Sequence, residues 1–173
     1  MAQNFFISQS TIGIDLNNQS TTALFAVGTK CFGTQDTEWV YVQAATTIQG
    51  LTMVAYNTAF TCGMASATDV ITGLHLATAQ TSISNSAFGW VAIRGTNLTI
   101  KFTGTVSVGG SVQVQLGASA MPTGLLIGVT VGTASCTLQG VHVQATASDS
   151  GNSGNVAQFI LSWPKAATVG VGG

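Results

Sequence analysis

The closest pair of acidic side chains in the sequence is formed by Asp36 and Glu38. Two carboxylates that converge on one point can serve as a general acid and a general base, and residues i and i+2 share one face of a strand. This pair, however, belongs to the polar run 34–38, which directly precedes Trp39. Such runs favour turns beside strands, so we expect a solvated turn and not a catalytic dyad.

The other residues that could carry chemistry are isolated from one another. His75 and His142 each stand between two apolar residues, and a metal site built on them would need a further ligand such as Asp69 or Asp149. The sequence has no nucleophile elbow, Walker A loop or dinucleotide-binding glycine motif. We therefore expect no catalytic residue, no metal, no cofactor, no small-molecule substrate and no enzymatic activity. The cysteines form no C-x-x-C pair and are expected to be free buried thiols: Cys31, Cys62 and Cys136.

The composition is poor in charge: charged residues make up 5% of the chain, and the net charge is −1. Soluble domains usually carry about 25% charged residues. The four basic residues are widely separated, so we expect no nucleic-acid partner. No apolar stretch approaches the length of about 18 residues that a membrane span needs, and the N-terminus lacks the basic start of a secretory leader. We expect neither a membrane partner nor secretion, and a neutral surface that neighbouring subunits cover.

The elements that would have to position any site are short strands. Leu98, Ile100 and Phe102 alternate with polar residues, and a second alternating run follows Gly109-Gly110, so this part of the chain predicts a hairpin that turns near these glycines. No long window shows helical periodicity. The pattern predicts an all-β fold, either a small β-barrel or a β-sandwich. Strands are expected at residues 24–27, 39–42, 51–56, 73–76, 88–93, 98–102, 112–116, 125–131, 141–143 and 159–163.

Three regions are predicted along the chain. Residues 1–36 form an N-terminal extended arm or added strands, residues 37–165 form the barrel domain, and residues 166–173 form a flexible C-terminal tail. Large aromatic residues serve either as core anchors or as interface hot spots. We expect Trp39 and Trp90 in the core of the barrel domain.

Four apolar residues are candidates for contact with another subunit. Phe5, Phe6 and Ile7 form an apolar group near a chain terminus, where a segment is frayed unless something holds it, and Trp163 stands beside a proline near the other end. We expect the N-terminal group to dock on a neighbouring subunit. The alternative is that residues 4–16 form an extra strand of the barrel itself.

Four phrases of the sequence, taken in order, resemble the capsid decoration or cement proteins of tailed bacteriophages. The resemblance covers roughly residues 37–164, and residues 1–36 depart from it. It rests on the strand Trp39-Val-Tyr-Val-Gln-Ala44, the segment Gln49-Gly-Leu-Thr-Met-Val-Ala-Tyr56, the phrase Ala87-Phe-Gly-Trp-Val-Ala-Ile-Arg-Gly95 and the closing segment Val156-Ala-Gln-Phe-Ile-Leu-Ser-Trp-Pro164.

The resemblance implies a structural virion protein that sits on an icosahedral shell as a homotrimer and bridges subunits of the major capsid protein. Its location would be the capsid surface, after synthesis in the host cytoplasm. The scarcity of charge agrees with this function independently. Another viral structural or surface β module, such as a minor shell protein, a head fibre or a glycan-binding adhesin domain, is the alternative, and a carbohydrate-binding module is a third class.

Overall fold

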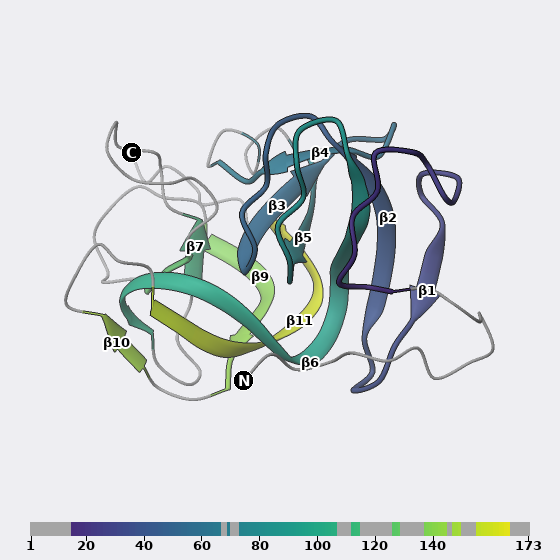
Figure 1. Cartoon of the computed structure of the whole chain (residues 1–173). Helices are drawn as coiled ribbons and strands as arrows, with labels where there is room; N and C mark the ends of the chain where they lie inside the picture. Colours follow the sequence, from purple (N-terminus) through teal and green to yellow (C-terminus); the bar gives the residue numbers. More distant parts are fainter. Residues whose placement is uncertain are drawn as a thin grey trace.

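The computed structural model of the chain describes residues 15–66, 69, 73–106, 112–114, 126–128, 137–144, 147–149 and 155–166. Within these residues the fold is all-β, and the paired strands form one connected system (Figure 1). The strands are β1 (Lys30–Phe32), β2 (Glu38–Ala44), β3 (Thr52–Tyr56), β4 (Thr61–Met64), β5 (His75–Ala79), β6 (Phe88–Val106), β7 (Val112–Val114), β8 (Leu126–Gly128), β9 (Thr137–Val143), β10 (Ala147–Asp149) and β11 (Asn155–Ala166).

Five of these strands close into a barrel. β2 pairs with β4 in parallel, and the antiparallel pairs β4–β3, β3–β5, β5–β6 and β6–β2 complete the ring. A closed ring satisfies the backbone hydrogen-bonding groups that an open sheet would leave at its edges. The structure therefore confirms the predicted all-β fold and decides for the barrel, with further strands added to it.

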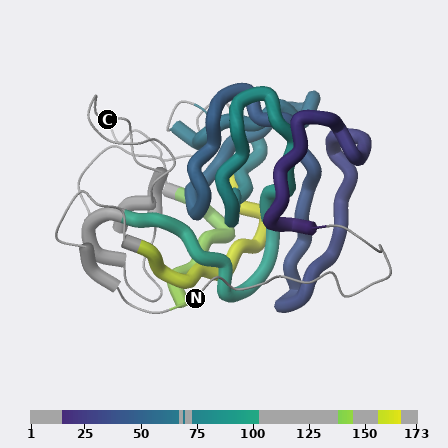
Figure 2. The backbone as a smooth tube through the Cα atoms, in the orientation of Figure 1, coloured from purple at the N-terminus to yellow at the C-terminus, as the bar shows by residue number. Residues whose placement is uncertain are grey.

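The long strand β6 extends beyond this barrel into a second set of pairings. Its later residues pair with β11, which pairs with β9, and the pairs β9–β7, β7–β8 and β8–β6 lead back to β6. The two circuits thus share one strand. Figure 1 shows β6 curving from the barrel toward β7 and β10, with β11 and β9 beside its far half, and Figure 2 shows the coloured part of the same chain as a smooth tube in the same orientation.

The inside of the barrel is filled by small apolar side chains. In β2, Val40 and Val42 point inward, and cross-strand partners such as Val91 and the facing pair Val54 and Ala77 join the same cluster. Five strands enclose little room, so Val and Ala fit where larger residues would not. This explains why the barrel strands contain β-branched and small residues.

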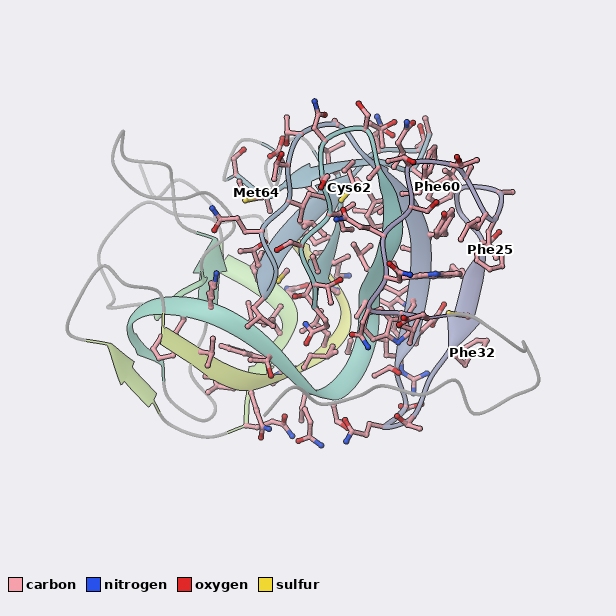
Figure 3. All side chains as sticks on the ribbon, in the orientation of Figure 1. Phe25, Phe32, Phe60, Cys62 and Met64 are labelled. Carbon is pink, nitrogen blue, oxygen red and sulfur yellow. The ribbon has the colours of Figure 1, made fainter. Side chains whose placement is uncertain are left out.

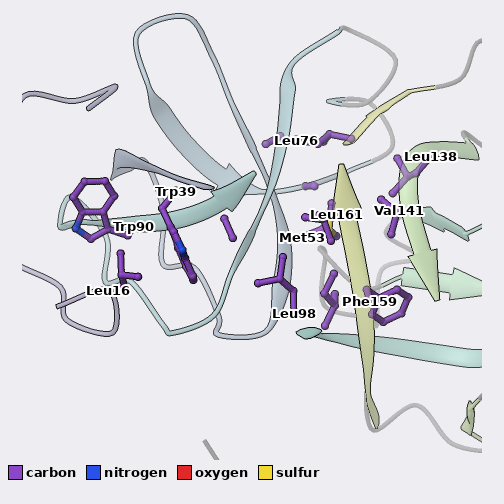
Figure 4. Close-up of a cluster of buried hydrophobic side chains, with 14 of the residues drawn as sticks. Leu16, Trp39, Met53, Leu76, Trp90, Leu98, Leu138, Val141, Phe159 and Leu161 are labelled. Atoms are coloured by element: carbon purple, nitrogen blue, oxygen red, sulfur yellow. The ribbon is translucent and has the colours of Figure 1, made fainter. Parts of the chain in front are cut away.

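The outer faces of the same strands are buried as well. Trp39 and Tyr41 alternate with the inward residues of β2 and belong to a second cluster, which continues under β9 and β11. Strands buried on both faces contain continuous apolar runs, and β2 has such a run from Trp39 to Val42. Trp39 and Trp90 are fully or almost fully buried, which confirms their prediction as core residues. Figure 4 shows this outer cluster running from Leu16, Trp39 and Trp90 past Met53 and Leu98 to Val141 and Phe159.

Between its two circuits, β6 changes conformation. Gly95 and Asn97 have positive φ values of 145° and 57°, which glycine and asparagine tolerate better than other residues. Side-chain amides replace backbone partners here. Gln144 accepts a hydrogen bond from the Asn97 N–H at 2.9 Å, while Gln80 both accepts from Thr99 N and donates to Thr99 O.

Several predicted strands are confirmed, and their local patterns agree. Leu98, Ile100 and Phe102 share one fully buried face of β6, as their alternation predicts. The predicted hairpin is wrong: among the described residues, β7 pairs with β8 and β9, and none of its pairings is with β6. Residues 24–27 form turns and bends and not a strand, and the sequence reading missed β1, β4 and β10.

The first thirty-six residues are described from Asp15 onward. Leu16 is buried in the outer cluster, Ser20 forms an isolated bridge with Phe88, and β1 pairs with β2. The described part of this segment therefore packs on the barrel and adds one strand to it. The apolar group Phe5, Phe6 and Ile7 lies outside the described residues, as does the tail beyond residue 166, so their predicted docking and flexibility stay predictions.

Candidate interaction surface

Trp163 is displayed by a bulge in β11. The pairing of β11 with β9 shifts register between Leu161 and Lys165, and Trp163 has a φ of 47°. A residue in this left-handed region leaves the ordinary alternation of a strand. Trp163 is 53% exposed, whereas the next residue, Pro164, is buried.

The bulge depends on a glycine in the neighbouring strand. Gly140 in β9 has a φ of 75°, and a Cβ atom added there would lie 2.3 Å from the carbonyl oxygen of Ser162. Only a residue without a side chain lets the two backbones approach so closely. The exposure of Trp163 is thus built into the pairing of β9 with β11.

The indole of Trp163 is held in place from one side. The guanidinium carbon of Arg94 lies 5.0 Å from the centre of its ring, within the range of a cation–π contact. Arg94 in turn donates a hydrogen bond from Nη2 to Asp36 Oδ2 and forms an ion pair with it. The exposed tryptophan is therefore held by a contact within the fold, and an exposed side chain that is already restrained would lose less entropy on binding than a free one.

Trp163 lies next to the end of a row of residues that face one another across four neighbouring strands. Phe32 of β1 lies opposite Glu38 of β2, Glu38 lies opposite Arg94 of β6, and Arg94 lies opposite Ser162 of β11. Neighbouring strands are about 4.8 Å apart, so three steps separate the two ends of this row by roughly 14 Å. We call the surface formed by Phe32, Asp36, Arg94 and Trp163 the Trp163 surface.

Phe32 is the second exposed aromatic residue of this surface. Its side chain is 60% exposed, and Figure 3 shows it on the flank of the molecule that β1 occupies. Its neighbour Lys30 donates a hydrogen bond to Glu38 Oε1 at 2.9 Å. In each of the two ion pairs, Lys30–Glu38 and Arg94–Asp36, the basic side chain neutralises the acidic one. The surface therefore carries two exposed aromatic side chains and little net charge.

The structure corrects the sequence reading of Asp36 and Glu38. Asp36 does lie in an exposed turn, with a φ of 56°. Glu38, which the same prediction placed in a solvated turn, begins β2 and is only 6% exposed. The two carboxylates pair with different basic residues and do not converge on one point.

The remaining candidates for chemistry are spread over the fold. His75 is exposed and stacks on Tyr56 at 5.2 Å between ring centres, and His142 is exposed on β9. Among the described residues, no group of three or more histidine, cysteine or acidic side chains is arranged to hold a metal ion. In the same part of the chain, no helix is long and apolar enough to cross a membrane.

The described thiols are buried and free. Burial raises the pKa of Cys31 and of Cys62 to about 12, so both are neutral thiols at ordinary pH. The pKa of Tyr56 is also raised, first by burial and then by the nearby Cys62 and Glu38. These groups belong to the core and not to the Trp163 surface.

Of the four predicted interface residues, Trp163 is the one that the structure describes. Sequence reasoning missed Phe32 and Arg94 as its companions. The sequence signal for β1 was the polar–apolar alternation at Lys30, Cys31 and Phe32. Strand alternation is recognised over about four to eight residues, and three residues are too few. No family model matches the chain, and no curated protein matches its sequence.

Proposed function

We propose that the chain is a structural virion protein that decorates an icosahedral bacteriophage capsid and cements it by bridging subunits of the major capsid protein. The observation that carries the proposal is the exposed Trp163, whose indole ring is restrained by a cation–π contact with Arg94. Trp and Arg are the residue types most enriched among interface hot spots. The resemblance of four phrases to capsid decoration proteins supplies the class of partner.

The charge distribution also supports a role in assembly. The chain has four basic and five acidic residues, and two ion pairs at the Trp163 surface tie up four of them. A surface with so little free charge resists self-association poorly and is easily desolvated by a partner. These properties suit a subunit whose surface is buried against neighbouring subunits in the assembled particle.

The assembled form that we propose is a homotrimer on the capsid surface, after synthesis in the host cytoplasm. The three-fold positions of an icosahedral lattice suit a cyclic trimer. A reconstruction of the decorated particle should show three copies around each such position. Single isolated copies on the mature particle would contradict the trimer without touching the rest of the proposal.

The direct test is binding to capsids that lack the protein, measured by co-sedimentation. Replacing Trp163 with alanine should weaken binding about thirtyfold or more, because hot-spot residues of this type contribute at least about 2 kcal/mol and about 1.4 kcal/mol is a factor of ten. Val156 is the matched control, since it lies in the same strand and is 51% exposed. Val156→Ala should bind like the unmodified protein, and wild-type binding by Trp163→Ala would refute the role of this surface.

A further inference from the structure

A pocket of about 90 Å³ lies between the segment that precedes β1 and the outer faces of β2 and β6. One water molecule needs about 10–15 Å³ measured in the same way, so the pocket has room for more than ordered solvent. It is smaller than a typical site for a drug-sized ligand. Its size therefore fits part of a ligand, such as a single ring at the end of a longer chain.

One wall of the pocket is aromatic. Tyr41 lies at its centre, with ring centres 5.4 Å from Phe25, 6.0 Å from Phe88 and 5.0 Å from Trp90. Tyr41 and Trp90 are buried, and their neighbours Phe25 and Phe88 are half-buried and also line the pocket. The Tyr41 hydroxyl accepts a hydrogen bond from Leu24 N at 3.2 Å, which fixes the wall to the preceding segment.

The polar part of the lining comes from residues 15–20. Asp15 Oδ1 accepts a hydrogen bond from Asn17 N, and Ser20 Oγ accepts one from Thr22 N. Gln19 Oε1 accepts from Ser84 N, which orients the amide. The Gln19 amide nitrogen, the Ser20 hydroxyl proton and the second oxygen of Asp15 take no part in these bonds. The pocket lining therefore combines hydrogen-bond donors and acceptors with aromatic rings.

A sugar ring matches this division of the pocket. One face of a pyranose presents C–H groups that pack on aromatic rings, while its edge carries hydroxyl groups that both donate and accept hydrogen bonds. We infer that this pocket binds one neutral pyranose ring of a glycan through Phe25, Phe88 and the polar side chains of residues 15–20. This inference goes beyond the proposed function and does not depend on it.

The charge of the lining excludes several other classes of small ligand. The lining contains no lysine or arginine, so it offers no partner for a phosphate or sulfate group. The single carboxylate of Asp15 repels acidic sugars and accepts hydrogen bonds from hydroxyl groups. A neutral hexose or N-acetylhexosamine is therefore the chemical class that the lining fits.

Saturation-transfer NMR on the isolated full chain tests the inference. The probes are the methyl glycosides of glucose, galactose, mannose and N-acetylglucosamine, in both anomeric forms. A single ring makes few contacts, so we expect at least one probe to bind with a dissociation constant on the order of millimolar. The protons of one ring face should receive the strongest transfer, because they lie on the aromatic wall.

Two variants assign the binding to the pocket. Phe25→Leu keeps an apolar side chain of similar size but removes the flat ring, so it should keep the wild-type thermal midpoint and lose at least tenfold in affinity. Phe60→Ala is the control, because Phe60 is half-buried, stacks on Tyr56 and does not line the pocket. Absence of transfer to every probe would overturn the inference, and so would unchanged affinity in Phe25→Leu.

Discussion

Arg94 and Trp163 stand one above the other, with the guanidinium carbon 5.0 Å from the centre of the indole ring. The two residues belong to different strands, β6 and β11, and lie sixty-nine positions apart in the sequence. Ser162, the neighbour of Trp163, lies opposite Arg94 in the strand register. The contact therefore links the position of an exposed aromatic residue to the pairing of the strand that the two circuits share.

This contact should be worth little to the isolated fold. Exposed cation–π contacts contribute about 0.5–1 kcal/mol, and the ion pair with the exposed Asp36 contributes a similar or smaller amount. A double-mutant cycle with Arg94→Gln and Trp163→Leu, followed by urea unfolding, should give a coupling free energy of about 0.5–1 kcal/mol. Arg94→Gln should nevertheless weaken the capsid binding that we propose, since Trp163 loses its cation–π contact. A coupling near zero together with unchanged binding would contradict this role of Arg94.

Replacement by alanine should lower the free energy of unfolding more at Gly140 than at Gly73, although the two glycines have nearly equal φ values. Gly140 (75°) would place a Cβ 2.3 Å from Ser162 O, whereas Gly73 (78°) has no atom within 4 Å of that position. Gly73→Ala should therefore cost only the left-handed backbone conformation, about 1–2 kcal/mol. Gly140→Ala should cost clearly more, because the backbones of β9 and β11 must also separate. Equal losses of unfolding free energy in thermal or urea unfolding would show that the bulge is not tightly packed.

The buried thiols should be protected from alkylation. The thiolate is the reactive form, and a pKa of about 12 keeps Cys31 and Cys62 protonated. In a Cys136→Ser background, iodoacetamide at pH 8 should leave the native protein unlabelled and add two labels after unfolding, as counted by mass spectrometry. Rapid labelling of the native protein would show that the barrel opens on the timescale of the reaction.

The same thiols predict a loss of stability in alkaline solution. Their folded pKa of about 12 lies above the ordinary value of 9.0, so folding favours the protonated form. Their contribution is fully present below about pH 9 and is lost as the pH rises toward 12. The free energy of unfolding should therefore fall over this interval, and Cys62→Ala should show a shallower fall. An equally steep fall in Cys62→Ala would assign the effect to other groups.

The ion pair between Lys30 and Glu38 is unevenly exposed, with side-chain exposures of 53% and 8%. Lys30→Ala leaves a buried carboxylate without its partner and should lower the free energy of unfolding by about 1–2 kcal/mol. Replacing Glu38 with glutamine in the same variant should restore part of the loss. Lys165→Ala is the control for removing an exposed lysine from a strand, and it should change stability by less than about 0.5 kcal/mol. A similar loss in both lysine variants would exclude a special role for the buried carboxylate.

Local patterns in the sequence determined several of the longer strands and, for β6, which face is buried. The alternation of Leu98, Ile100 and Phe102 follows directly from the period of 2 in a strand, and all three are buried. Trp39, a large aromatic residue within a domain of small ones, was likewise expected in the core, and it is fully buried. The scarcity of charge is a property of composition alone, and it led to the expectation of a surface covered by neighbours.

Strand partners were decided only by the tertiary structure. Gly109-Gly110 is a favourable local turn signal, yet β7 pairs with β8 and β9. The barrel closes through the parallel pair of β2 with β4, which no hairpin signal can announce. The entropy cost of closing a loop grows only slowly with its length, so packing between distant segments can outweigh the preference of a local turn.

The candidate surface shows the same division. Trp163 could be singled out from its residue type and its place beside Pro164, but its exposure results from a register shift opposite Gly140. Arg94 and Phe32 join it because four strands lie side by side at one level. A sequence pattern shows which residues are neighbours along one strand. A surface contains residues from several strands, and only the pairing of those strands brings these residues together.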